Sequence, residues 1–218
     1  MSENWTSDEL EGAVRAYVDM RNKEANGVPF RKKEYYANLS KQYGRTEKSY
    51  EYRMQNISYV YSLMGRNWVT GLRPAKNVGA RVSGELEALI NKIEGHSVPL
   101  VAEFQSSVNI LKQKKNPKRP KGNIKPNTYN STTTHYKRDP EVVAWVLYKA
   151  NGVCESCNNF APFTKEDETV FLEVHHLRQL SDGGSDRITN AIASCPNCHR
   201  ELHYGKNKKQ LLDRKSVV

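Results

Sequence analysis

Apolar side chains recur every three or four positions through the first part of the chain, with charged residues between them, which is the period of amphipathic helices. Thr6 and Glu9 have the spacing of a capping box before the first such run, which ends at the Gly-Val-Pro break at 27–29. Three further runs predict helices over 32–42, 50–61 and 84–93. We therefore expect an all-helical head domain at residues 1–104.

The pattern changes after residue 138. Asp139 and Pro140 are the N-cap and first residue expected of a helix, and apolar residues then recur up to Gly152. Further on, apolar and other residues alternate from Phe171 to Leu177, which is the period of a β-strand. A small domain at residues 139–218 is expected here, which makes the whole chain α+β.

Between these two parts lies a segment of different composition. Residues 112–138 contain three prolines, a Ser-Thr-Thr-Thr run and hardly any large aliphatic residue, so they bury too little surface to offset the entropy of ordering. They also contain nine basic residues and no acidic one, which is nearly all of the formal net charge of +10. We call residues 112–138 the basic segment and predict a basic linker at residues 105–138.

The basic segment predicts contact with a nucleic acid, because lysine and arginine bind phosphates and release counterions. A solvated linker that its own charge keeps extended is the alternative. Eight of the twelve tyrosines lie in the first 61 residues, where they fit a helical core better than a base-contacting surface. The candidate phosphate contacts, one of them in the third predicted helix, are Lys114, Lys115, Lys118, Arg119 and Arg53.

Membrane and secreted proteins are disfavoured. The chain has no run of about 18 apolar residues, and its first residues are polar and acidic where a secretory signal is basic and then apolar. We therefore expect a cytoplasmic protein without membrane association. In a reducing cytosol, paired cysteines indicate a metal more often than a disulfide.

The four cysteines form two Cys-x-x-Cys pairs. Each pair can direct two sulfurs at one ion, and together they make the tetrahedral set of a structural Zn²⁺ site. A redox Cys-x-x-Cys is the competing interpretation, which two pairs in one short domain disfavour. The predicted zinc ligands are Cys154, Cys157, Cys195 and Cys198.

Four of the six histidines lie between and after the cysteine pairs. His199 and His203 are four residues apart, so on a helix both imidazoles project from one face, as two ligands of one cation would. His175 and His176 are adjacent in the alternating stretch, so their side chains point to opposite sides of a strand. One of this adjacent pair is expected to bind the metal and the other to face the substrate as a base.

Further residues complete a family pattern. It consists of Glu173-Val-His175-His176, Ser181-Asp-Gly-Gly-Ser-Asp186, Asn190, Cys195-Pro-Asn-Cys-His199 and Leu202-His203. This pattern resembles the His-Asn-His (HNH, ββα-metal) nucleases. The stretch from Arg138 to about Leu211 is similar to the catalytic domain of McrA-like restriction endonucleases. The opening Trp5–Leu10, with Arg53–Ile57, is similar to the helical head that precedes some of these enzymes.

The resemblance implies roles for the site residues. His176 would be the general base, and Asn190 would brace the hairpin loop and orient that base. One divalent cation, Mg²⁺, Mn²⁺, Ni²⁺, Co²⁺ or Zn²⁺, would be bound by His175, His199 and His203. Glu173, two residues before His175 and on its side of the strand, would accept a hydrogen bond from a ligand imidazole.

The resemblance implies a metal-dependent DNA endonuclease of restriction type that acts on double-stranded DNA. A homodimer is expected, because each chain has one active site for two strands. A type IV enzyme that requires a modified base and a type II enzyme that reads an unmodified site both remain open. The alternative from another class is a non-catalytic, zinc-stabilised DNA-binding protein. RNA as the substrate is less favoured.

Overall fold

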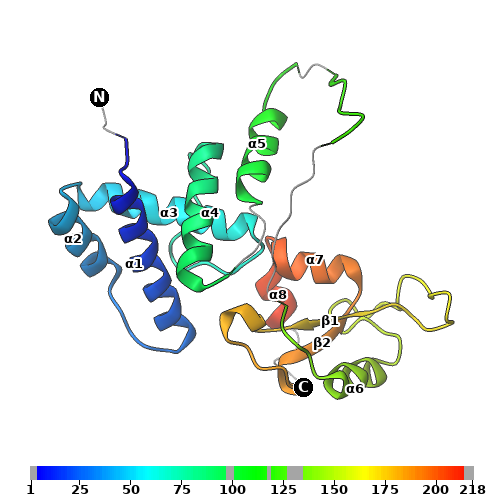
Figure 1. Cartoon of the computed structure of the whole chain (residues 1–218). Coiled ribbons are helices and arrows are strands. Elements are labelled where there is room, and N and C mark those ends of the chain that lie inside the picture. Colours follow the sequence, from blue (N-terminus) through cyan, green and yellow to red (C-terminus); the bar gives the residue numbers. More distant parts are fainter. Residues whose placement is uncertain (1–3, 97–100, 117–118, 127–134, 214–218) are drawn as a thin grey trace. The chain divides into compact units, whose positions relative to one another are not determined.

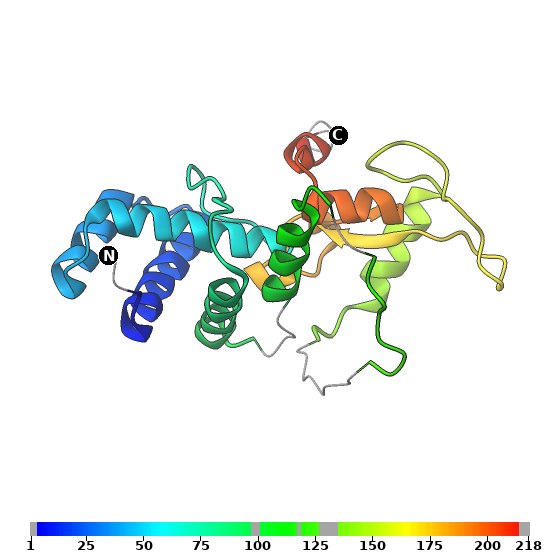
Figure 2. The same cartoon turned by 90° about the horizontal axis from the view of Figure 1, so that it is seen from above.

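The computed structural model describes residues 4–96, 101–116, 119–126 and 135–213. The chain forms two compact units, Met1–Thr134 and His135–Val218 (Figure 1; a second view is Figure 2). The first unit is helical and the second combines helices with a two-stranded sheet, so the predicted α+β class is confirmed. Within the described ranges, no helix is both long and apolar enough to cross a bilayer.

The described residues of the first unit form five helices. They are α1 (Ser7–Ala25), α2 (Lys32–Tyr43), α3 (Glu47–Leu63), α4 (Ala80–Glu94) and α5 (Ala102–Lys112). The first four coincide with the four predicted runs. The capping box also forms, because the Thr6 hydroxyl accepts from the Glu9 N–H at 3.2 Å and a Glu9 carboxylate oxygen accepts from the Thr6 N–H at 2.7 Å.

Helix α5 differs from the sequence-based expectation. The predicted end of the head at residue 104 and the predicted start of the linker at 105 both fall inside this helix. Ser106 Oγ donates to Ser83 Oγ of α4 at 3.0 Å, and Asn109 Nδ2 donates to the Tyr59 hydroxyl of α3 at 3.0 Å. The head therefore continues to Lys112.

Tyrosines fill much of the head's core. Tyr17, Tyr50 and Tyr61 are fully buried, and the rings of Tyr17 and Tyr61 stack with their centroids 5.4 Å apart. The Tyr17 hydroxyl is 2.7 Å from Ser58 Oγ and accepts from the Val69 N–H at 3.0 Å. These bonds satisfy a buried hydroxyl that would otherwise oppose folding.

One carboxylate organises a buried polar network in the head. Glu94 Oε1 accepts from Arg21 at 3.0 Å and from the Tyr61 hydroxyl at 2.6 Å, and its other oxygen accepts from Arg66. The three ionic side chains are each at most 10% exposed. This network joins α1, α3 and the end of α4 to the segment that follows α3.

The described part of the second unit has the order helix, strand, strand, helix, helix. Its elements are α6 (Pro140–Ala150), β1 (Glu173–His176), the 3-10 turns η1 (Leu180–Asp182) and η2 (Ile188–Asn190), β2 (Ala191–Ser194), α7 (Pro196–Tyr204) and α8 (Lys208–Asp213). β1 and β2 pair antiparallel, with Val174 opposite Ala193 and His175 opposite Ile192. A β-hairpin followed by α7 is thus the centre of the unit.

The two faces of this hairpin meet different helices (Figure 1). Val174 and Ala193 pack in one apolar cluster with Val146 and Ala150 of α6. Ile192, on the other face, packs with Leu202 of α7 and Leu211 of α8. Because β-strand side chains alternate, His175 projects toward α7 and His176 toward α6. The sheet therefore separates the two adjacent histidines.

Candidate functional site

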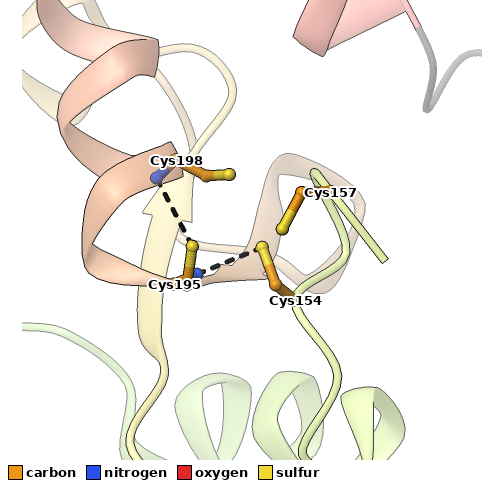
Figure 3. Close-up of side chains that lie close together, drawn as sticks. All are labelled: Cys154, Cys157, Cys195 and Cys198. Carbon is orange, nitrogen blue, oxygen red and sulfur yellow. Dashed lines mark hydrogen bonds between the residues drawn. The ribbon is translucent and has the colours of Figure 1, made fainter. Parts of the chain in front are cut away.

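The four cysteines come together at the start of α7 (Figure 3). Cys154 and Cys157 come from the loop after α6, and Cys195 and Cys198 come from the N-terminus of α7. Their sulfur atoms all lie within 4.8 Å of one another, and all four thiols are free. Sulfurs about 2.3 Å from one tetrahedral Zn²⁺ lie about 3.8 Å apart, so this cluster fits a structural zinc.

Backbone hydrogen bonds shape the first cysteine turn and fix it to the sheet. The Cys154 N–H donates to Asn159 O and the Asn158 N–H donates to Cys154 O, both at 2.8 Å. Asn158 has the left-handed φ of 60° that closes this turn. Glu155 donates its N–H to Ala193 O at 2.9 Å and accepts the Ala193 N–H at 2.7 Å. The two cysteine pairs are thereby held beside each other.

The environment of the Cys154 sulfur favours a thiolate. Burial by itself raises the pKa of this thiol, but the backbone N–H groups of Cys195, Cys157 and Ser156 outweigh it and bring the pKa down to about 7. The Cys195 N–H lies 3.2 Å from Cys154 Sγ (Figure 3). Zinc binds the deprotonated form, so these donors suit a metal ligand.

Three histidines form a second cluster on the α7 face of the sheet. His175 of β1 and His199 and His203 of α7 each offer a ring nitrogen, and these nitrogens lie within 4.8 Å of one another. The Nε2 atoms of His199 and His203 are 3.2 Å apart. Nitrogens about 2.1 Å from one metal ion lie about 3.0 to 3.4 Å apart. This cluster can therefore hold one divalent cation.

Burial keeps His175 neutral. Burial, with the neighbouring His203 and His199 imidazoles, lowers its pKa to about 3. At neutral pH the ring therefore carries a free lone pair, which is the form that binds a metal.

Two polar side chains orient the other imidazoles of this cluster. A Glu173 carboxylate oxygen lies 2.8 Å from His199 Nδ1, so the carboxylate accepts the Nδ1 proton and Nε2 faces the cluster. The Gln179 side-chain amide lies 3.0 Å from His203 Nδ1. The structure thus places Glu173 on His199, and Gln179 is a further contact that no sequence motif indicated.

His176 lies on the opposite face and has a carboxylate partner. Its Nε2 is 2.8 Å from Asp186 Oδ1, and its side chain is 9% exposed. Asp186 belongs to the family pattern, yet its place in the sequence suggested no role for it. No periodicity predicts this contact, because Asp186 lies beyond η1 in an irregular loop.

Asn190 braces that loop without contacting His176. Its Oδ1 accepts from the Arg178 N–H at 2.9 Å, while its Nδ2 donates to Arg178 O at 3.0 Å and to Ser185 O at 2.7 Å. These three bonds join the two ends of the segment from 178 to 185. Any effect of Asn190 on the orientation of His176 therefore passes through the loop.

The candidate DNA contacts lie in the first unit. Lys114, Lys115 and Arg119 are exposed, and Lys118 lies outside the described residues. The Arg53 guanidinium stacks 4.3 Å from the centre of the Trp5 ring. In the described part of the chain, Arg53 has no ion-pair partner, and its Nε is buried without a hydrogen bond.

Comparisons with known proteins add a family and two relatives to this geometry. Residues 154–205 match the family model of the HNH endonuclease. A stretch of 100 residues is 48% identical to the "Type IV methyl-directed restriction enzyme EcoKMcrA" of Escherichia coli (strain K12), covering 46% of this chain and 36% of that protein. A stretch of 34 residues is 47% identical to "Anaredoxin" of Nostoc sp., covering 16% of this chain and 45% of that protein.

The chain therefore spans less than two thirds of either relative. The family-model match covers the hairpin, α7 and the two candidate metal clusters. The matches bear out the family resemblance seen in the sequence. Residues 154–205 of this chain form a domain of the HNH endonuclease family.

Proposed function

We propose that this protein is a metal-dependent DNA endonuclease of restriction type. The observation that carries the proposal is the arrangement around β1, where three histidine nitrogens converge on one face of the sheet and His176 lies on the other. A protein that only binds DNA needs neither a cation cluster nor a histidine oriented by a carboxylate. The HNH domain and the restriction-enzyme relative favour the same reaction class.

The four histidines have two different roles in the proposed hydrolysis. His175, His199 and His203 would hold one divalent cation, which when bound supplies positive charge to the scissile phosphate and the leaving oxygen. His176 takes the proton from the attacking water, a role in general-base catalysis that an unprotonated imidazole nitrogen can fill. Glu173 and Gln179 keep two of the ligand rings in place.

The donor set limits the choice of cation. Three nitrogens with no carboxylate among them suit Mn²⁺, Co²⁺, Ni²⁺ or Zn²⁺ better than Mg²⁺, which prefers oxygen ligands. We expect cleavage to be faster with a transition metal than with Mg²⁺ at equal concentration. The four-cysteine cluster holds a separate structural Zn²⁺ that does not take part in the reaction.

The decisive experiment is DNA cleavage by the His176→Ala variant with each of these cations. Cleavage should fall by at least about 100-fold, because the base is lost, while DNA binding and zinc content remain. His96→Ala removes a histidine of the head and serves as the matched control, with unchanged cleavage. If His176→Ala cuts at the normal rate, the assignment of the base is wrong.

The same experiment tests the alternative function. A non-catalytic, zinc-stabilised DNA-binding protein would bind DNA and hold zinc, yet the wild-type protein would cut no DNA with any of the five cations. That result would replace the nuclease proposal with the binding one.

DNA contact is assigned to the basic segment and to Arg53. The segment's lysines and arginines have no acidic residue among them, and Lys114, Lys115 and Arg119 are exposed. The Arg53 guanidinium, already ordered by stacking on Trp5, can bind a phosphate at little cost in side-chain ordering. Replacing Lys114, Lys115, Lys118 and Arg119 by alanine should weaken binding. It should also flatten the dependence of log affinity on log salt, whose slope falls by about 0.9 for each phosphate that is no longer neutralised.

An equal slope in wild type and variant would identify the basic segment as a plain linker. Lys165→Ala, which removes an exposed lysine that already pairs with Asp167, is the control for removal of a surface charge.

The proposal that the endonuclease is a restriction enzyme rests on its similarity to a relative described as a methyl-directed restriction enzyme. Digestion of methylated and unmethylated copies of one plasmid separates the two classes. Cutting only the methylated copy supports a type IV enzyme, and equal cutting of both supports a type II enzyme.

The protein is proposed to act as a homodimer, because each chain has one active site and double-stranded DNA has two strands to cut. Analytical sedimentation of the protein with and without DNA measures its oligomeric state.

A further inference from the structure

Asp186 links the proposed base to the start of the first helix of its unit. Its Oδ1 is 2.8 Å from His176 Nε2, and its Oδ2 accepts the backbone N–H of Asp139 at 2.6 Å. Asp139 is the N-cap of α6, and its side chain is occupied by the Glu141 N–H at 2.8 Å. Both oxygens of the Asp186 carboxylate are therefore engaged, each by a different group.

The protonation state of the Asp186 carboxyl group decides whether Asp186 or His176 donates the hydrogen bond between them. The Asp139 N–H and then the His176 ring, with a smaller effect of Arg138, hold the pKa of Asp186 below its usual value against the effect of burial. An ionised carboxylate can only accept hydrogen bonds. The proton between Asp186 and His176 therefore belongs to Nε2. Within the described residues, the other ring nitrogen, Nδ1, has no hydrogen-bond partner.

We propose that Asp186 is a positioning residue that keeps His176 in the Nε2–H tautomer, so that Nδ1 is the nitrogen that receives the proton of the attacking water. The inference rests on the proposed function for its catalytic consequence. The tautomer of His176 itself can be measured without any DNA cleavage.

The loop gives Asp186 a fixed position. Asn190 Nδ2 donates to the carbonyl of Ser185, the residue directly before Asp186, at 2.7 Å. The same amide group is anchored on Arg178, at the exit of β1. Asn190 therefore acts on His176 through Ser185 and Asp186, which explains how it can orient the base without contacting it.

Because Asp186 also accepts the backbone N–H of Asp139, the Asp186→Asn variant tests the tautomer of His176. In Asp186→Asn, the amide oxygen has to face the Asp139 N–H, since that group can only donate. The amide NH₂ then faces His176 Nε2 and requires a lone pair there, which moves the ring proton to Nδ1. The variant keeps the size and the Asp139 contact of the native residue but stabilises the wrong tautomer. In Asp186→Ala, either tautomer is allowed.

Asp186→Asn should slow cleavage more than Asp186→Ala does, because only the asparagine stabilises the wrong tautomer. We expect kcat to fall roughly 1000-fold in Asp186→Asn and roughly 10- to 100-fold in Asp186→Ala, with KM nearly unchanged in both. A purely structural role predicts the reverse order, because asparagine preserves the shape. Asp182→Asn removes a charge from the same loop and should leave kcat unchanged. A milder loss in Asp186→Asn than in Asp186→Ala, or an equal loss in Asp182→Asn, would overturn the proposal.

A second measurement does not depend on activity. The ring ¹⁵N chemical shifts of His176 in the zinc-loaded full chain, identified by their absence in His176→Ala, report its tautomer. We expect Nε2–H in the wild type and Nδ1–H in Asp186→Asn. An Nδ1–H ring in the wild type overturns the inference, whatever the protein cuts. An Nε2–H ring in a protein that cuts no DNA supports the inference and rejects the nuclease function.

Discussion

The two units of this chain reach stability in different ways. Among the residues that the structure describes, the twelve largest fully buried side chains all lie in the head and include Tyr17, Tyr50 and Tyr61. The buried cluster around α6 consists of valines, alanines and one leucine, together with two of the cysteines. Burial of apolar area stabilises a fold by about 25 cal/mol per Å². The head can rely on its core, whereas we expect the second unit to depend on a metal bound by its four cysteines.

This difference means that one perturbation should destabilise only one unit. A change in the tyrosine core or its polar network acts on the head, and a change at the cysteines acts on the HNH domain. Thermal unfolding of the full chain should therefore show two transitions that can be shifted separately.

The largest effect is expected from loss of the structural zinc. Cys154→Ala leaves three sulfurs, and a structural zinc contributes on the order of 10 kcal/mol to the folding of a small domain. The HNH domain should lose its cooperative transition and its zinc, while the head's transition stays in place. Calorimetry measures the two unfolding transitions, and metal analysis measures the zinc content. An unchanged transition and unchanged zinc stoichiometry would show that the second unit does not depend on the metal.

A smaller effect is expected from the buried network of the head. Glu94→Ala leaves Arg21 and Arg66 buried without their carboxylate, which costs about 3 to 5 kcal/mol. Only the head's transition should move, as followed by urea unfolding. Glu85→Ala is the matched control, because its partner Arg81 is 78% exposed and such pairs contribute less than about 1 kcal/mol. Equal effects of the two changes would contradict the assigned role of the network.

The smallest effects are expected at helix caps, one in each unit. Thr6→Ala removes the cap of α1 and Asp139→Ala removes the cap of α6, at about 1 kcal/mol each. Thr6→Ala should lower only the head's transition, and Asp139→Ala only that of the HNH domain. The Asp139 N–H to Asp186 is a backbone contact and survives the second change. A shift of both transitions by either variant would mean that the units unfold together.

Hydrophobic periodicity predicted four of the helices in the head and failed for α5. The reason lies in how α5 packs. Phe104 is 71% exposed and Leu111 is 54% exposed, so the large apolar residues of α5 do not form an inward-facing stripe. Its hydrogen bonds to α3 and α4 come from the Ala102 N–H, Ser106 and Asn109, and the apolar residue that it adds to the buried core cluster is the small Ala102. Apolar spacing alone therefore assigns such a helix to the linker.

The order of residues was enough to define the local chemistry of the site. Two Cys-x-x-Cys pairs, the spacing of His199 and His203, and the adjacency of His175 and His176 are all local features. They could be interpreted from the sequence because a turn, a helix or a strand fixes the side-chain directions.

The sequence already indicated Glu173 as the acceptor for a ligand imidazole, but the histidine that it meets and the contacts of Asp186 became evident only in the folded chain. Glu173 meets His199 across 26 residues, and Asp186 meets both His176 and the N–H of Asp139, 47 residues away. These contacts depend on the path of an irregular loop and on how α6 and α7 pack on the sheet. No local period encodes them, because they are set by the packing of the whole unit.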